Sequence, residues 1–152
     1  LLRLRLTDPA DRPGRGGPSD EHSVLEAVDA LEAAFARHDL GAVLDLFASD
    51  ADVGFIGSAR SEQAVGRAAL ERDLARLLAL PEVADGTLTI AWSRRRVRVE
   101  RDVAWVLCLG RATWATSRRH SVFDYRLTGV LVRRHGRWLW HTHHGSAPGA
   151  LS

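Results

Sequence analysis

A chain of 152 residues has the usual size of one domain and can bury enough apolar surface to fold without disulfides or metals. Its formal net charge is only +2 despite 21 basic residues, and the densest basic run has no base-stacking motif beside it, so we expect no nucleic-acid partner. No apolar run approaches the roughly 18 residues of a membrane-spanning helix, so we expect no membrane partner.

The chain begins with a segment rich in helix breakers. Residues 1–20 contain the following prolines and glycines: Pro9, Pro13, Pro18, Gly14, Gly16 and Gly17. This composition is typical of a flexible arm. We therefore predict an N-terminal arm over 1–20, a single domain over 21–148 and a short tail over 149–152.

Cysteine usage bears on the cellular compartment. Cys108 is the single cysteine, so it can form no internal disulfide, and it lies within an apolar run. We expect it to be a small buried side chain in a protein of the reducing cytoplasm.

Three helices are predicted in the first half of the chain. Ser23 and Glu26 fit a capping box, which predicts a helix over about 23–37 with an apolar stripe. Asp39 suits the N-cap of a short second helix. Leucines at helical spacing predict a third helix over 67–80, where a proline then enforces a stop.

The second half changes from helical to alternating periodicity. From Thr87 onward we predict four long strands separated by turns near 100–102, 117–120 and 135–136, besides a short strand over 53–56. Helices followed by such a meander are incompatible with a doubly wound parallel sheet. We therefore expect the helices to pack on one face of an antiparallel sheet.

Particular residues near the end of the chain carry a family resemblance. The carriers are the strand 126–132, the turn His135-Gly136, and the closing pattern Gly136, Trp138, Trp140, His144 and Ser146, preceded by 55–57 and 66–70. In this order they resemble the nuclear transport factor 2-like superfamily, specifically its SnoaL-like branch, over about 23–146. The resemblance implies an α+β fold in which a cone-shaped, curved antiparallel sheet packs against three N-terminal helices and encloses a pocket.

The same family hosts isomerases, dehydratases, cyclases, epoxide hydrolases and non-catalytic assembly domains, so the fold does not fix the function. Members similar to ketosteroid isomerase carry a base carboxylate on the short first strand, where this chain has Phe55. The association domain of calcium/calmodulin-dependent kinases carries pocket arginines where this chain has Gly110, Gly129 and Gly145. Neither that base nor that anion site is carried over.

Strand alternation sorts the side chains that can meet in the pocket, because residues two apart share a face. Tyr125 and Leu127 share the apolar face of the third long strand. The resemblance to the association domain places His141 and His143 on that same concave side, opposite Trp138 and Trp140. The predicted site is as follows: catalytic His141, His143 and Tyr125; ligand-binding Trp114, Leu127, Val106, Cys108 and Phe55.

An apolar cavity with a few convergent polar groups is typical of a small-molecule site. We predict that a small apolar ligand undergoes lyase, isomerase or hydrolase chemistry, with His141 or His143 accepting a proton and Tyr125 donating one. The alternative is a non-catalytic ligand-binding or assembly module in which these groups are hydrogen-bonded core residues. We predict no cofactor and no metal, because zinc would need ligands beyond the histidines.

A second apolar face is predicted on the other side of the sheet. It comprises Trp105, Leu107, Leu109, Trp138 and Trp140. Monomers seldom leave so large an apolar patch exposed, so we expect a homodimer through the outer face of the sheet.

Overall fold

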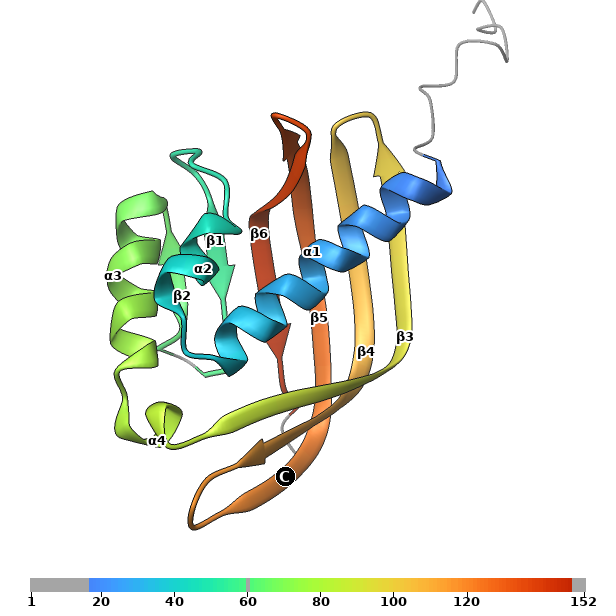
Figure 1. Ribbon diagram of the computed structural model, residues 1–152. Coiled ribbons are helices and arrows are strands. Elements are labelled where there is room, and N and C mark those ends of the chain that lie inside the picture. Colours follow the sequence, from blue (N-terminus) through green and yellow to red (C-terminus); the bar gives the residue numbers. More distant parts are fainter. Residues whose placement is uncertain (1–16, 60, 149–152) are drawn as a thin grey trace, which may run out of the picture.

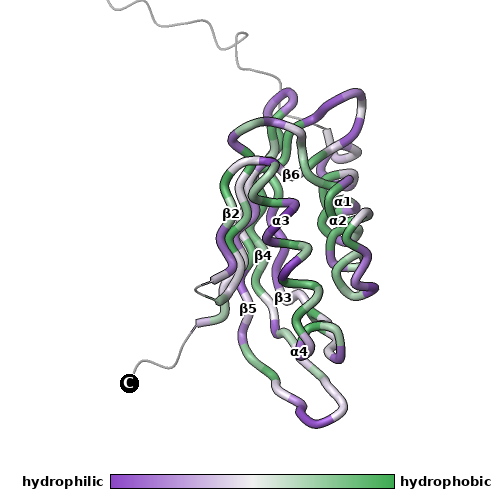
Figure 2. The backbone as a smooth tube through the Cα atoms, turned by 90° about the vertical axis from the view of Figure 1, so that its left-hand side faces the viewer, coloured by the Kyte–Doolittle hydropathy of each residue, from purple (hydrophilic) through white to green (hydrophobic). Residues whose placement is uncertain are grey.

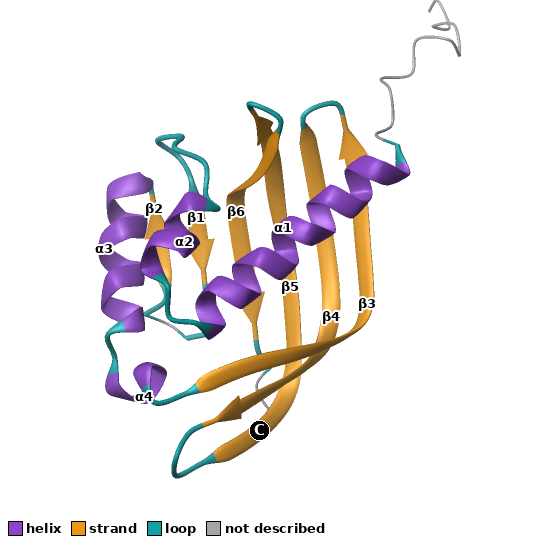
Figure 3. Ribbon diagram, viewed as in Figure 1, coloured by secondary structure: helices purple, strands orange, loops and turns teal. Residues whose placement is uncertain are grey.

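The computed structural model describes residues 17–59 and 61–148, and places the helices on one face of a curved, open sheet (Figures 1 and 3). The elements are α1 (Pro18–Ala36), α2 (Leu40–Asp45), β1 (Gly54–Ile56), β2 (Gln63–Val65), α3 (Arg67–Leu78), α4 (Pro81–Ala84), β3 (Thr87–Glu100), β4 (Val103–Ala115), β5 (His120–Arg134) and β6 (Arg137–Ser146). The predicted α+β fold, a curved sheet packed against N-terminal helices, is confirmed. None of the described helices is long and apolar enough to cross a membrane.

Helix α1 begins earlier than the capping-box interpretation predicted. Its N-cap is Gly17 and Pro18 occupies the first turn, so Ser23 lies inside the helix and caps nothing. Proline is favoured there because its fixed φ suits the helix and its missing N–H would have no partner. The predicted arm over 1–20 therefore overlaps the start of α1, while 1–16 and the tail 149–152 lie outside the described residues.

The other helix boundaries follow the sequence closely. Asp39 caps α2 as predicted, because its carboxylate accepts a hydrogen bond from the backbone N–H of Ala42 at 3.0 Å. Helix α3 begins at Arg67 and ends at Leu78. The chain then turns into α4, whose first residue is Pro81.

The sheet has the strand order β2-β1-β6-β5-β4-β3. The hairpins that join β3 to β6 lie where the sequence predicted them, and these four strands pair antiparallel. The β1–β6 pair is parallel, so the sheet is mixed and not purely antiparallel. Strand β2 was not predicted, because three residues are too few to show a period.

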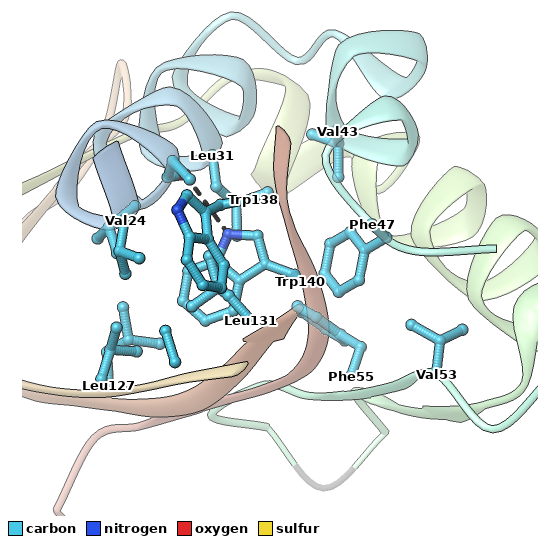
Figure 4. Close-up of a cluster of buried hydrophobic side chains, with 14 of the residues drawn as sticks. Val24, Leu31, Val43, Phe47, Val53, Phe55, Leu127, Leu131, Trp138 and Trp140 are labelled. Carbon is cyan, nitrogen blue, oxygen red and sulfur yellow. Dashed lines mark hydrogen bonds between the residues drawn. The ribbon is translucent and has the colours of Figure 1, made fainter. Parts of the chain in front are cut away.

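The last strand contains a β-bulge that reverses its alternation. Val130 pairs with Thr142 but Leu131 pairs with Trp140, so His141 is an extra residue in β6. Trp138 and Trp140 therefore share the inner face with His143. Both tryptophans are buried, and the indole N–H of Trp140 donates to the backbone carbonyl of Ala27 on α1 at 3.4 Å (Figure 4). The predicted opposition of the tryptophans to His143 is thus wrong.

A second bulge has the same effect on β3. The register shifts between Trp92 and Arg94, which places both Trp92 and Arg95 on the inner face. Arg95 reaches α1, where its guanidinium donates to the Asp29 carboxylate at 2.6 Å and to the carbonyl of Leu25 at 3.2 Å. This ion pair and the Trp140 hydrogen bond tie α1 to the two halves of the sheet.

Candidate functional site

A cavity of about 610 Å³ lies between α1 and the concave face of the sheet. Aromatic and aliphatic side chains make up most of its lining. The aromatic residues in the lining are Phe35, Phe55, Trp114, Phe123, Tyr125 and Trp140. The ionisable ones are Asp29, Glu32, His38, Glu62, Tyr125 and His143. Such an apolar cavity with a few polar groups is suited to a small molecule.

Five of the eight residues that the sequence placed in the site line this cavity. They are Tyr125, His143, Trp114, Leu127 and Phe55. Val106 and Cys108 lie on the same face but belong to the closed core and do not contribute to the lining. Burial raises the pKa of the Cys108 thiol, which stays protonated and behaves as the small buried side chain expected.

His141 lies apart from the cavity. As the extra residue of the bulge it turns away from the concave face, and its Nε2 lies 3.1 Å from the carboxylate of Asp52. Its Nδ1 lies 3.1 Å from the hydroxyl of Thr142. The structure therefore brings Tyr125 and His143 together but not His141.

Three inward-facing glycines make room for the rings that shape the site. A Cβ on Gly110 would lie 2.9 Å from the indole of Trp92, and a Cβ on Gly129 would lie 2.6 Å from that of Trp140. A Cβ on Gly145 would lie 2.0 Å from the hydroxyl of Tyr125. In this chain aromatic rings therefore fill the space beside these three glycines.

Tyr125 and His143 meet above Gly145. The same Cβ position at Gly145 is 2.0 Å from Tyr125 Oη and 3.4 Å from His143 Cε1, so both side chains share one small volume of the cavity. Burial, and then the nearby carboxylates of Glu62 and Glu32, raise the pKa of Tyr125 to about 12. The phenol is therefore a neutral hydrogen-bond donor at physiological pH.

The imidazole of His143 is buried between two rings. It stacks on Phe55 with centroids 5.0 Å apart and meets Trp140 edge-on at 5.2 Å. Burial lowers its pKa to about 4, so the ring is neutral near pH 7. Its Nδ1 is buried and has no hydrogen-bond partner among the described residues. A buried polar atom without a partner is costly to the folded state.

Glu32 is a site residue that the sequence analysis missed. It projects from α1 into the cavity, where its Oε1 accepts a hydrogen bond from the indole N–H of Trp92 at 2.6 Å. Burial raises the pKa of Glu32 to about 7. Its position was a usable signal, because it lies four residues after Val28 and three before Phe35, on the apolar stripe of the helix.

No metal centre is evident in the described part of the chain. Within 17–59 and 61–148, no group of three or more His, Cys, Asp or Glu side chains lies close enough to hold an ion.

Comparisons with known proteins agree on the fold. The family model of the SnoaL-like domain matches residues 24–150. No curated protein matches the chain. A nuclear transport factor 2-like protein of unknown function from Pseudomonas putida has a TM-score of 0.73 at 17% identity, covering 90% of this chain and 92% of that one.

Two further solved structures carry functional names. A candidate dehydratase from Streptomyces avermitilis has a TM-score of 0.72 at 21% identity, covering 87% of this chain and 98% of that one. A ketosteroid isomerase-like protein from Erwinia carotovora atroseptica has a TM-score of 0.68 at 18% identity, covering 88% and 99%. At these identities the likeness concerns the fold alone. Because the family model covers most of the chain, this protein belongs to the SnoaL-like branch of the nuclear transport factor 2-like superfamily.

Proposed function

We propose that the chain binds a small, largely apolar molecule in the cavity between α1 and the sheet. The observation that carries this proposal is the cavity itself, whose volume of about 610 Å³ and mainly apolar lining suit such a ligand. The dehydratase and isomerase-like names of two proteins with this fold support a ligand-binding or enzymatic role. The buried single thiol of Cys108 supports a reducing compartment, the cytoplasm.

The finer proposal is acid–base chemistry of the lyase, isomerase or hydrolase kind. Tyr125 is the hydrogen-bond donor to a developing oxyanion, and the neutral ring of His143 is the proton acceptor beside it. Their meeting above Gly145 supports this pairing. The role of His141 as a proton acceptor stays a prediction, because its ring lies beside Asp52 and apart from the cavity.

The alternative is binding without catalysis. A histidine with a pKa of about 4 is a weak base, and Phe55 occupies the place where isomerase-like relatives carry a carboxylate. Both observations favour a cavity that holds a ligand unchanged. Ligand binding and proton transfer therefore need separate tests.

Binding is tested with N-phenyl-1-naphthylamine, an apolar dye that becomes fluorescent when it leaves water. In the variant Leu127→Trp a larger ring projects into the cavity, and we expect the dye to bind at least about tenfold more weakly because overpacking costs about 1–3 kcal/mol. The matched control is Arg126→Trp, which alters the neighbouring residue on the outer face of β5. Equal affinities for both variants would place the dye elsewhere and count against the cavity.

Proton transfer is tested with 2-tetralone in deuterated buffer. Abstraction of a proton from the carbon next to the carbonyl forms an enolate, which then takes up a deuteron, so NMR measures the exchange directly. We expect the protein to accelerate this exchange and His143→Gln to slow it by about a hundredfold, the usual effect of losing a general base. Exchange at the parental rate would remove His143 from the mechanism, and dye binding without any exchange would establish the non-catalytic alternative.

We also propose a homodimer through the outer face of the sheet, the face without helices (Figure 2). The patch predicted from the sequence needs correction, because Trp138 and Trp140 are buried under α1. The exposed residues that support the dimer are Trp105, Leu107, Ile56 and Val65. We call these four residues the outer patch.

A further inference from the structure

The charged side chains that line the cavity are unevenly distributed. All 21 basic side chains of this protein are arginine, yet no described arginine lines the cavity. Three carboxylates do, those of Asp29, Glu32 and Glu62. The cavity is therefore acidic in a chain whose net charge is slightly positive.

Two of these carboxylates are already engaged by the protein. Asp29 forms an ion pair with Arg95 at 2.6 Å. Glu62 accepts a hydrogen bond from the backbone N–H of Ala59 at 3.1 Å, within the turn between β1 and β2. Both have structural partners that account for their positions.

Glu32 differs from them because no described cation lies within ion-pair distance of it, although the charge of Arg95 acts on it from nearby. Its hydrogen bond comes from the neutral indole of Trp92, and no other described residue donates to its carboxylate. Burial of this carboxylate disfavours its charged form, because desolvation is costly. The protein itself offsets little of that cost. A cation supplied by a ligand would provide the missing partner.

We propose that Glu32 is the recognition group for a protonated amine on an aromatic ligand, which the cavity holds between α1 and the sheet. The inference rests on the proposed binding function and specifies the class of ligand. It follows from a carboxylate without an ion-pair partner among the described residues, an aromatic lining and the lack of an arginine among the described lining residues.

A further feature of the cavity fits an aromatic amine. The faces of aromatic rings attract cations, and Phe35, Phe123 and Tyr125 all belong to the lining. The site thus offers an anionic group beside aromatic and aliphatic walls.

The pH dependence of binding should report the ionisation of Glu32. With a pKa of about 7, roughly 1% of its carboxylates are ionised at pH 5 and roughly 90% at pH 8. Because a cation binds the ionised form, its affinity should rise over this range. An alkylamine stays protonated throughout it.

Three of the other groups around Glu32 do not take part in this change. Tyr125 on β5 has a pKa of about 12, His143 on β6 one of about 4, and burial raises that of Cys108 on β4, so these three keep one charge state between pH 5 and pH 8. The remaining charged or titratable neighbours are Asp29 and His38 near α1, Arg95 on β3, and Glu62 after β1. A variant at Glu32 separates its effect from theirs.

The test compares three probes of one shape by calorimetry: 2-(1-naphthyl)ethylamine, 2-(1-naphthyl)ethanol and 1-naphthaleneacetate. At pH 8 we expect the amine to bind at least tenfold more tightly than the alcohol, and the acetate more weakly than both. At pH 5 the amine should lose most of this advantage. Glu32→Gln should abolish the preference and its pH dependence while still binding the alcohol, whereas Glu26→Gln, on the exposed side of α1, should change neither.

The possible failures are distinguishable. If the alcohol and the amine bind equally well to the parent protein at pH 8, the cavity function stands and the amine inference is wrong. A preference that survives in Glu32→Gln would also overturn it, since the cation would then pair elsewhere. If none of the three probes binds, the proposed binding function fails together with the inference.

Discussion

The carboxylate of Glu32 lies at the boundary between α1 and the sheet, where the helix faces apolar rings. Its hydrogen bond to Trp92 and the charge of Arg95 favour the ionised form, while burial and the charge of Asp29 oppose it. Burial is the largest of these effects, so the pKa is raised to about 7. A residue kept in this position at a cost to folding is a candidate for a functional role.

That cost predicts how stability changes with pH. The pKa of Glu32 is higher in the folded chain than its ordinary value of 4.5, so the folded state binds its proton more tightly than the unfolded state. Ionisation of Glu32 therefore destabilises the fold increasingly from about pH 4.5 to pH 7. Glu32→Gln should match the parent at pH 4.5 and exceed its free energy of unfolding by about 1 to 2 kcal/mol at pH 8, a value that allows for partial exposure. Urea titrations of both proteins at the two pH values measure the difference. A parent protein that is as stable as Glu32→Gln at pH 8, or more stable, would contradict the prediction.

Individual residues of the site were partly predictable from the sequence. Tyr125, Leu127 and Trp114 line the cavity, on the face that alternation along unbroken stretches of strand predicts for them. Glu32 was missed because a charged residue in a helix usually faces solvent, although its place on the apolar stripe of α1 was a usable signal. The partner Trp92 is 60 residues away, beyond the reach of any local pattern.

At the scale of the element, β-bulges limit what a period of two can predict. The positions of β3 to β6 and their turns followed from periodicity, but the faces of β6 did not. One extra residue, His141, exchanges the inner and outer sets, so Trp138 and His143 share a face although they differ by an odd number of positions. No residue type marks this position, because a bulge depends on pairing with the neighbouring strand.

Close packing excludes side chains at glycine positions in these strands. Two alanine substitutions, one at Gly129 and one at Gly136, test this. A Cβ at Gly129 would lie 2.3 Å from the carbonyl oxygen of Thr142 and 2.6 Å from the ring of Trp140. Gly129→Ala should therefore lower the free energy of unfolding by about 1–3 kcal/mol or more and change the near-ultraviolet circular dichroism of Trp140.

The control for that comparison is Gly136→Ala in the β5–β6 turn. Gly136 has a φ of 77° and no atom within 4 Å of the added Cβ. Its cost should be backbone strain of about 1–2 kcal/mol, with an unchanged aromatic spectrum. If both variants alter the spectrum equally, the close contact between position 129 and the ring of Trp140 is not the reason for the glycine at that position.

At the scale of the whole molecule, the helices cover one side of the sheet and leave the other uncovered (Figure 2). Cross-strand pairing aligns Trp105 on β4 with Val65 on β2 through one continuous row across the outer face. The next row contains Leu107 and Ile56. The outer patch therefore consists of two exposed pairs, one on β4 and one on β1 and β2, which are aligned across β5 and β6. Its members are between 40% and 77% exposed.

The outer patch predicts a dimer that one charged substitution disrupts. Two copies related by a twofold axis bury the same patch on each, so Leu107→Arg introduces two charges into one interface. We expect light scattering to show a dimer for the parent at micromolar concentration and a monomer for this variant. Val122→Arg is the matched control, because Val122 is similarly exposed but lies toward the β4–β5 turn, outside the outer patch. A monomeric parent would refute the dimer, and a dimer that survives Leu107→Arg but not Val122→Arg would move the interface to the other end of the sheet.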